Sequence, residues 1–238
     1  MKAVEVRELV KDYGNFRALK GISFEVNEGE IFGLIGPNGA GKTTALRVIA
    51  TLLQITSGLV KVFDYELPKE AGEVRKIISY LPEEAGAYKN LTGKEYLNFI
   101  AKFFGEGEKF QQTVRTGLEI AKLGERINDK VDTYSKGMTR RLLVGRALMV
   151  NPRLAILDEP TSGLDVLNAQ EVRRIINSAV EAGVAVLLSS HNMLEVELLC
   201  HRIALMNNGK IIAGGTVEEL KKKYDARNIE EAFVKAIG

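Results

Sequence analysis

The chain has 238 residues, of which 45% are hydrophobic and 27% charged, a composition typical of a folded globular protein. Lysine and arginine total 33 against 31 acidic residues, and this net charge of +2 excludes a surface that coats nucleic acid or membrane by charge alone. The single cysteine, Cys200, excludes an internal disulfide and favours a reducing compartment, where it is expected to be a small buried residue. The charged N-terminus and the short apolar runs predict neither a signal peptide nor a membrane span.

Two segments near the N-terminus, 4–7 and 22–27, alternate apolar and polar residues with the period of half-buried antiparallel strands. The continuous apolar run 31–35 follows a turn and fits a strand that is buried on both faces. Similar runs recur at 76–81, 154–157 and 184–188. Helical spacing of apolar residues separates them, with Leu46, Ile49 and Leu53 after the first run and residues 172–179 before the last. Strands alternating with helices predict a largely parallel α/β sheet.

Residues 83–150 show helical patterns without clear strands, for example Leu97, Ile100 and Phe104 at helical spacing, and predict a helical insertion. Farther on, Asn-Gly at 208–209 predicts a hairpin, and Thr216 with Glu219 forms a capping-box pattern for a last helix through Tyr224. We therefore expect one α/β domain with a mostly parallel sheet and an N-terminal antiparallel β subdomain. Its predicted parts are an α/β core at 1–82 and 151–215, a helical subdomain at 83–150 and a helical tail at 216–238.

A glycine-rich segment directly follows the predicted strand 31–35 and matches the P-loop pattern G-x-x-x-x-G-K-[ST]. In such a loop the backbone N–H groups and the helix N-terminus surround phosphates, the lysine reaches the β- and γ-phosphates, and the threonine hydroxyl binds Mg²⁺. The alternative, an ordinary glycine-rich turn, does not account for the strand–loop–helix setting. The predicted phosphate-binding residues are Gly36, Pro37, Asn38, Gly39, Ala40, Gly41, Lys42, Thr43 and Thr44.

Asp158 and Glu159 end the apolar run 154–157. A parallel sheet brings the carboxyl ends of its strands to one edge, so both carboxylates are expected beside the P-loop. Asp158 would hold Mg²⁺ through oxygen, and Glu159 would act as general base toward an attacking water. Two acidic residues that merely end a strand would be the simpler interpretation if no P-loop were present.

These motifs resemble those of the ATP-binding subunits of ABC transporters, above all the branch that serves export and drug resistance, and the resemblance covers nearly the whole chain. Asp-Glu-Pro-Thr-Ser-Gly-Leu-Asp at 158–165 is similar to the family's Walker B motif and D-loop, and Ser-Ser-His at 189–191 to its switch-histidine segment. Residues 229–235 are similar to the C-terminus of that branch.

The resemblance implies that Tyr13 stacks on adenine, that His191 senses the γ-phosphate and aligns water with Glu159, and that Asp165 belongs to the nucleotide site. From the residues alone, a tyrosine at a strand end is more often a packing residue, and a lone histidine is usually structural. His201 matches no motif and is expected to be structural.

Two segments depart from the family pattern. Glu83 stands where most members have glutamine; its oxygen can still bind Mg²⁺, but it has no hydrogen-bond donor for water. Tyr-Ser-Lys-Gly-Met at 134–138, the signature segment, replaces Leu-Ser-Gly-Gly-Gln and keeps Ser135 and Gly137 at the start of a helix that can face a γ-phosphate. Lys136 adds a charge there, and Met138 removes a polar contact, so we expect a working but weaker or asymmetric site.

In the family the signature segment completes the site of a second copy, so the resemblance implies two ATP-binding subunits, as a homodimer or a heterodimer, with ATP between them. Hydrolysis would open the pair and drive an integral membrane permease, contacted through residues 83–98, where Tyr88, Leu91 and Tyr96 lie. The alternative for these residues is the core of the helical subdomain. The expected location is the cytoplasmic side of the cell membrane, at its inner face, through the permease.

The same motifs allow two alternatives. A soluble ABC-type ATPase acting on nucleic acid or a protein complex usually carries a coiled coil, a zinc element or a second cassette, which this sequence lacks. A subunit without catalysis would not need Lys42, Asp158, Glu159 and His191. The lysine run 221–223 fits a solvated helix face, so no nucleic-acid partner is expected.

Overall fold

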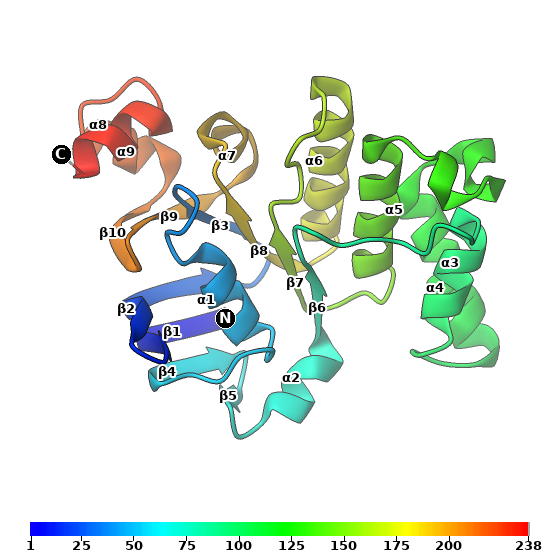
Figure 1. Cartoon of the computed structure of the whole chain (residues 1–238), viewed down its shortest axis with the longest axis horizontal. Helices are drawn as coiled ribbons and strands as arrows, with labels where there is room; N and C mark the ends of the chain where they lie inside the picture. Colours follow the sequence, from blue (N-terminus) through cyan, green and yellow to red (C-terminus); the bar gives the residue numbers. More distant parts are fainter. Residues whose placement is uncertain (238) are drawn as a thin grey trace.

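Two β-sheets with helices around them organise residues 1–237, the part of the chain that the computed structural model describes (Figure 1). Gly238, the last residue of the predicted tail 216–238, lies outside the described residues. The strands are β1 (Lys2–Tyr13), β2 (Phe16–Asn27), β3 (Ile31–Ile35), β4 (Ser57–Val62), β5 (Tyr65–Leu67), β6 (Ile78–Leu81), β7 (Leu154–Asp158), β8 (Ala185–Ser190), β9 (Arg202–Asn207) and β10 (Lys210–Gly215).

Helices connect these strands and cover the larger sheet. They are α1 (Lys42–Ile49), α2 (Ala71–Ile77), α3 (Gly93–Ala101), α4 (Gly107–Ala121), α5 (Lys136–Leu148), α6 (Val166–Glu181), α7 (Met193–Leu199), α8 (Val217–Lys223) and α9 (Ile229–Ile237), with 3-10 turns at Gly124–Asn128 and Val131–Thr133. Within residues 1–237, no helix combines the length and the apolar character that a membrane crossing requires.

The smaller sheet is antiparallel, in the order β2-β1-β4-β5, and the larger has the order β10-β9-β3-β8-β7-β6. All neighbours in the larger sheet are parallel except β10, which pairs antiparallel with β9 through the predicted Asn-Gly hairpin. The expected fold class, an α/β core with a mostly parallel sheet and an N-terminal antiparallel part, is confirmed. The apolar residues that alternate in β1 and β2, such as Val4 and Val26, are buried.

The core forms two clusters on the two faces of the larger sheet. In β3, Ile31 and Ile35 belong to the cluster under α5 and α6, while Phe32 and Leu34 belong to the cluster shared with α1 and the antiparallel sheet. Because successive side chains of a strand point to opposite faces, a strand with both faces covered needs a continuous apolar run. Cys200 lies in the first cluster, and burial raises the pKa of its thiol, as expected for a packing residue.

Residues 83–150 leave the sheet after β6 and return to it at β7. Figure 1 shows α3, α4 and α5 gathered at one end of the molecule, beyond β6 and β7, and α8 and α9 at the opposite end. Leu142 and Leu143 of α5 join the same apolar cluster as β7 and β8, so the helical segment is anchored on the sheet. The boundaries of the predicted parts, at 82, 150 and 215, stay predictions.

Three boundaries differ from the sequence prediction. The run 76–81 is not all strand: α2 continues to Ile77, because Ala71, Val74 and Ile77 recur at helical spacing and pack on the second core cluster, and β6 begins at Ile78. Helix α1 ends at Ile49, before Leu53, because Thr51 adopts a left-handed φ of 64° that interrupts a helix. Phe104 likewise lies beyond the end of α3 at Ala101.

The helix that starts at Thr216 is not the last one. Thr216 and Glu219 form the expected capping box, but α8 ends at Lys223 and α9 follows. Asn228 accepts a hydrogen bond from the backbone N–H of Glu231 at 2.8 Å, which caps α9. This Asn–Glu spacing was a sequence signal for a further helix start.

Candidate functional site

The P-loop connects β3 to α1 with the predicted strand–loop–helix geometry. At Gly41, φ is 102° and a Cβ atom would lie 2.9 Å from Leu19 Cδ2, so both the backbone and the space require glycine. At Gly36 a Cβ atom would collide with the carbonyl oxygen of Met206. The loop is therefore fixed by packing before any ligand binds.

Lys42, the first residue of α1, folds back over this loop. Its Nζ donates to the carbonyl oxygens of Gly36 at 2.7 Å and Pro37 at 3.2 Å, and lies 3.7 Å from Glu159 Oε1. Burial lowers the pKa of the Lys42 ammonium, and the negative charges of Glu159 and Asp158 oppose that effect. A cation held in this way has hydrogen bonds to exchange with an incoming phosphate.

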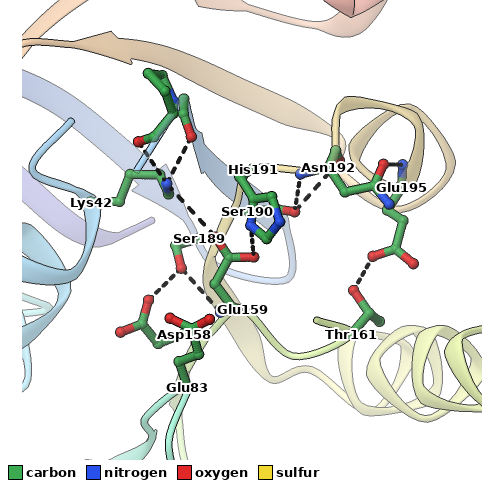
Figure 2. A network of polar contacts seen from close by, with 12 residues as sticks. Lys42, Glu83, Asp158, Glu159, Thr161, Ser189, Ser190, His191, Asn192 and Glu195 are labelled. Atoms are coloured by element: carbon green, nitrogen blue, oxygen red, sulfur yellow. Dashed lines mark hydrogen bonds and ion pairs between the residues drawn. The ribbon is translucent and has the colours of Figure 1, made fainter. Parts of the chain in front are cut away.

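Asp158 ends β7, and several hydroxyl groups surround its carboxylate; Figure 2 shows that of Ser189. Thr43 Oγ1 donates to Asp158 Oδ1 at 3.1 Å and Ser189 Oγ at 2.5 Å, while the Tyr80 hydroxyl lies 3.5 Å from Oδ2. Burial is the main cause that raises the pKa of Tyr80, which keeps its proton for donation. The structure thus joins Thr43 to Asp158, two of the three residues predicted to hold Mg²⁺.

The donor set at this point consists of a threonine hydroxyl and a carboxylate, which are oxygen ligands suited to Mg²⁺. Residues 1–237 contain no group of three or more His, Cys, Asp or Glu side chains placed to hold a metal ion by themselves. Mg²⁺ is usually bound by one or two protein oxygens together with phosphate and water, and Thr43 and Asp158 offer two such oxygens in contact. The residues present therefore fit the ion.

Glu159 follows Asp158 and turns away from it into the space beside Lys42. Its backbone has a left-handed φ of 50°, a strained state for a residue other than glycine, and its N–H donates to Ser189 O at 3.2 Å. His191 Nδ1 lies 2.9 Å from Glu159 Oε2, so the carboxylate contacts Lys42 with one oxygen and the imidazole with the other (Figure 2). The structure brings together all three predicted catalytic residues.

An open groove of about 400 Å³ lies in front of the P-loop. Besides the P-loop, Tyr13, Phe16, Glu83 and Glu159 line it. Tyr13 is 45% exposed and Phe16 is 66% exposed, so both rings offer a free face to a base. Phe16, which was not predicted, lines the same groove as Tyr13; its signal was an aromatic residue at the start of β2, directly after the turn that follows Tyr13.

Arg140 is a second residue that sequence reasoning missed. It lies in α5, is 7% exposed, and its Nη2 donates to the carbonyl oxygen of Glu83 at 3.0 Å. Its buried Nη1 has no hydrogen-bond partner among residues 1–237. Burial lowers the pKa of its guanidinium, and the charges of Glu83, Asp158 and Glu159 oppose that effect. The loop that carries Glu83 is thus tied to the helix that carries the signature segment.

The signature segment and Asp165 lie together but apart from the groove. Ser135 caps α5 and accepts from Met138 N at 3.2 Å, and Asp165 caps α6 and accepts from Asn168 N at 2.9 Å. The hydrogen bond from the Asn168 N–H also lowers the pKa of Asp165. A Cβ atom at Gly137 would collide with the Asn168 side chain, so the two helix starts are in contact. Within the described residues, Ser135, Gly137 and Asp165 do not line the P-loop groove.

The family model described as ABC transporter matches residues 19–162, which is more than half of the chain. The chain belongs to the ABC transporter family. It is 38% identical over 98% of its length to the linearmycin resistance ATP-binding protein LnrL of Bacillus subtilis (strain 168), of which it covers 76%. The chain spans only 41% of a second relative, the probable multidrug ABC transporter ATP-binding protein YbhF of Escherichia coli (strain K12), to which it is 37% identical over 98% of its own length.

Solved structures agree with this assignment. An ATP-binding subunit of an ABC transporter superposes with a TM-score of 0.87 at 29% identity, covering 99% of this chain and 100% of the other. A dimeric ATP-binding cassette in a post-hydrolysis state, bound to ADP and Pi, has a TM-score of 0.79 at 25% identity, covering 90% and 98%. The expectation of an ATP-binding, ATP-hydrolysing ABC cassette is confirmed.

Proposed function

We propose that this ABC protein is the ATPase of an exporter of the drug-resistance type, and that it closes with a second ATP-binding subunit around two ATP molecules to drive a separate integral membrane permease. The observation that carries the proposal is the Glu159 carboxylate held between Lys42 at 3.7 Å and His191 at 2.9 Å, at the border of the P-loop groove. The resistance role named for LnrL supports the export branch over a soluble ATPase.

Each groove residue has a role in this proposal. The adenine stacks at Tyr13, and the phosphates lie on residues 36–44, where Lys42 exchanges its carbonyl partners for β- and γ-phosphate oxygens. Glu159 accepts a proton from the attacking water. His191 holds the Glu159 carboxylate in orientation and is free on its exposed side to meet the γ-phosphate.

Mg²⁺ would be held by Thr43 and Asp158, which already contact each other, with Glu83 at the border of the same groove. When bound, the ion neutralises phosphate charge. Ser189 donates to the same Asp158 oxygen as Thr43 and so keeps the carboxylate turned toward the P-loop helix.

A second subunit is part of the proposal because Ser135, Gly137 and Asp165 lie outside the groove of their own chain. Ser135 starts α5, and a helix start attracts phosphate; Asp165 starts α6 directly beside it, since Gly137 of α5 touches Asn168 of α6. The dimeric cassette reported above supports an arrangement in which they face the ATP of the partner. A homodimer and a heterodimer with a related subunit both fit this arrangement.

The permease contact is proposed at a row of aromatic residues beside α3. Tyr88, Phe99 and Phe103 are exposed, with ring centroids 5.5 Å apart for Tyr88 and Phe99 and 5.4 Å apart for Phe99 and Phe103. Tyr96 packs under Tyr88 and is buried, so it belongs to the core, as the alternative interpretation held. An exposed aromatic row of this kind is typical of a protein interface. Through this contact the ATPase would reside at the inner face of the cell membrane.

Co-purification tests the proposal. A tagged Glu159→Gln form, taken from native membranes in mild detergent with ATP, should retain a protein with several membrane spans, and Phe103→Ser should lose that protein while keeping ATP binding. Glu181→Gln, at the exposed end of α6, is the matched control. Recovery of soluble proteins or nucleic acid alone would refute the transport role.

A further inference from the structure

Glu195, in the first turn of α7, holds two partners that come from different elements. The Thr161 hydroxyl donates to Glu195 Oε2 (Figure 2). Arg173 Nη1 of α6 lies 3.3 Å from Glu195 Oε1. The Arg173 and Glu195 side chains are 15% and 16% exposed. An ion pair so largely removed from water is screened less than a surface pair and restricts both side chains.

Together with the backbone, these contacts form a closed chain of linked residues that includes the Glu159 carboxylate. Thr161 follows Glu159 with only Pro160 between them, and the proline ring fixes the backbone φ of that link. On the other side, Glu195 lies four positions after His191, and Asn192 caps the intervening turn by accepting from Glu195 N at 3.4 Å. The 2.9 Å contact between His191 and Glu159 closes this chain of linked residues.

Farther along α7, Glu197 Oε1 accepts from the backbone N–H of Ile229 at 2.6 Å, so α9 holds the middle of the helix rather than its start. Helix α7 has only seven residues, of which Val196 and Leu199 are buried, while Leu194 and Leu198 are exposed. The Asn192 backbone N–H is fixed by Ser190 Oγ at 3.0 Å, within the same loop. The Thr161–Glu195–Arg173 contacts therefore join this turn to the segment after Glu159 and to α6.

We propose that Glu195 is a positioning residue for ATP hydrolysis: by holding Thr161 and Arg173 it sets the start of α7 so that the His191 imidazole stays against the Glu159 carboxylate. Through Arg173 the same contact ties this geometry to α6, the helix that begins after Asp165. The inference rests on the proposed ATPase mechanism. A displacement of about 1 Å at a reacting group can cost on the order of 100-fold in rate, so a lost contact of this kind is measurable.

Glu195→Ala should lower kcat for ATP by about tenfold or more and leave KM within about twofold, because Glu195 does not line the nucleotide groove within residues 1–237. Thr161→Val should have a similar effect, and Thr161→Ser, which retains the hydroxyl, should restore most of the turnover. Glu181→Ala, exposed at the end of α6, is the matched control. Thermal melting of each variant verifies that it is folded, and the Val and Ser pair decides the question if Glu195→Ala does not fold.

The decisive measurement is the ATP turnover of Glu195→Ala in a His191→Ala background. If Glu195 acts through His191, Glu195→Ala causes no further loss of residual turnover there. An equal loss in both backgrounds, or a raised KM with unchanged kcat, would overturn the positioning role. Absence of ATP hydrolysis by the unmodified protein would overturn the proposed function as well, whereas normal turnover of Glu195→Ala would overturn this inference alone.

Discussion

Replacing Glu159 with glutamine separates proton transfer from binding. The side chain keeps its size, its backbone N–H still donates to Ser189, and the amide oxygen can still face Lys42. Only the ability to take a proton and the negative charge are lost. Because the groove is lined by the P-loop and the aromatic residues as before, ATP binding should persist.

The sizes of the expected losses in kcat and in the free energy of unfolding follow from this chemistry and these contacts. A general base contributes about 10²–10⁴-fold to a rate, so kcat should fall by that factor, about 3–5 kcal/mol of transition-state stabilisation. The effect on folding is smaller, since Lys42 keeps the carbonyl oxygens of Gly36 and Pro37 at 2.7 Å and 3.2 Å. We expect a loss of about 1–2 kcal/mol in the free energy of unfolding, or a Tm lower by about 2–8 °C.

Phosphate release measures kcat, calorimetry measures ATP affinity, and size-exclusion chromatography with ATP should show a dimer that persists because hydrolysis does not open it. Glu181→Gln should match the unmodified protein in all three assays. Turnover of Glu159→Gln within a few-fold of the unmodified protein would refute the role of the carboxylate as base. Loss of ATP binding in a folded variant would show that Glu159 acts in binding instead.

Three further substitutions probe the rest of the site. Lys42→Ala should reduce ATP binding below detection by calorimetry, since it removes the buried cation over the P-loop; unchanged affinity would contradict the phosphate assignment. Met138→Gln, which restores the polar residue of the family signature, should raise the dimer fraction at a given ATP concentration in size-exclusion chromatography, and no change would show that this residue does not limit dimerisation. Glu83→Gln should lower Tm by about 2 °C at most, because the charge that it removes near the buried Arg140 is exposed and therefore screened by solvent; a raised Tm would exclude that compensation.

The parts of the site that follow strands were predictable from sequence. The P-loop, Asp158 and Glu159 each come directly after a continuous apolar run, and parallel pairing of β3, β8 and β7 carries them to one edge. The spacing within the motifs indicates which residues belong to the site, and the order of the parallel strands brings those residues together. His191 follows β8 and arrives at the same edge for the same reason.

The contacts that link those motifs to the helices could not be predicted. Arg140 reaches Glu83 across 57 positions, and Glu195 reaches Thr161 across 34, through side-chain orientations that depend on how α5 and α7 pack. Charged residues on a helix are usually solvated, so nothing in the sequence pattern marked these two as buried or half-buried. The end of α1 was missed for a local reason, the left-handed backbone at Thr51.

The folded-back position of Lys42 has a consequence for which anions can bind. Its ammonium already has two carbonyl acceptors and a carboxylate nearby, so an incoming anion takes part in an exchange of partners rather than in the filling of an empty site. An anion with one charged group, such as inorganic phosphate, replaces few of these interactions and gains little. A chain of phosphates that also reaches the backbone N–H groups of the loop gains many, so the loop discriminates in favour of polyphosphates before it contacts any base.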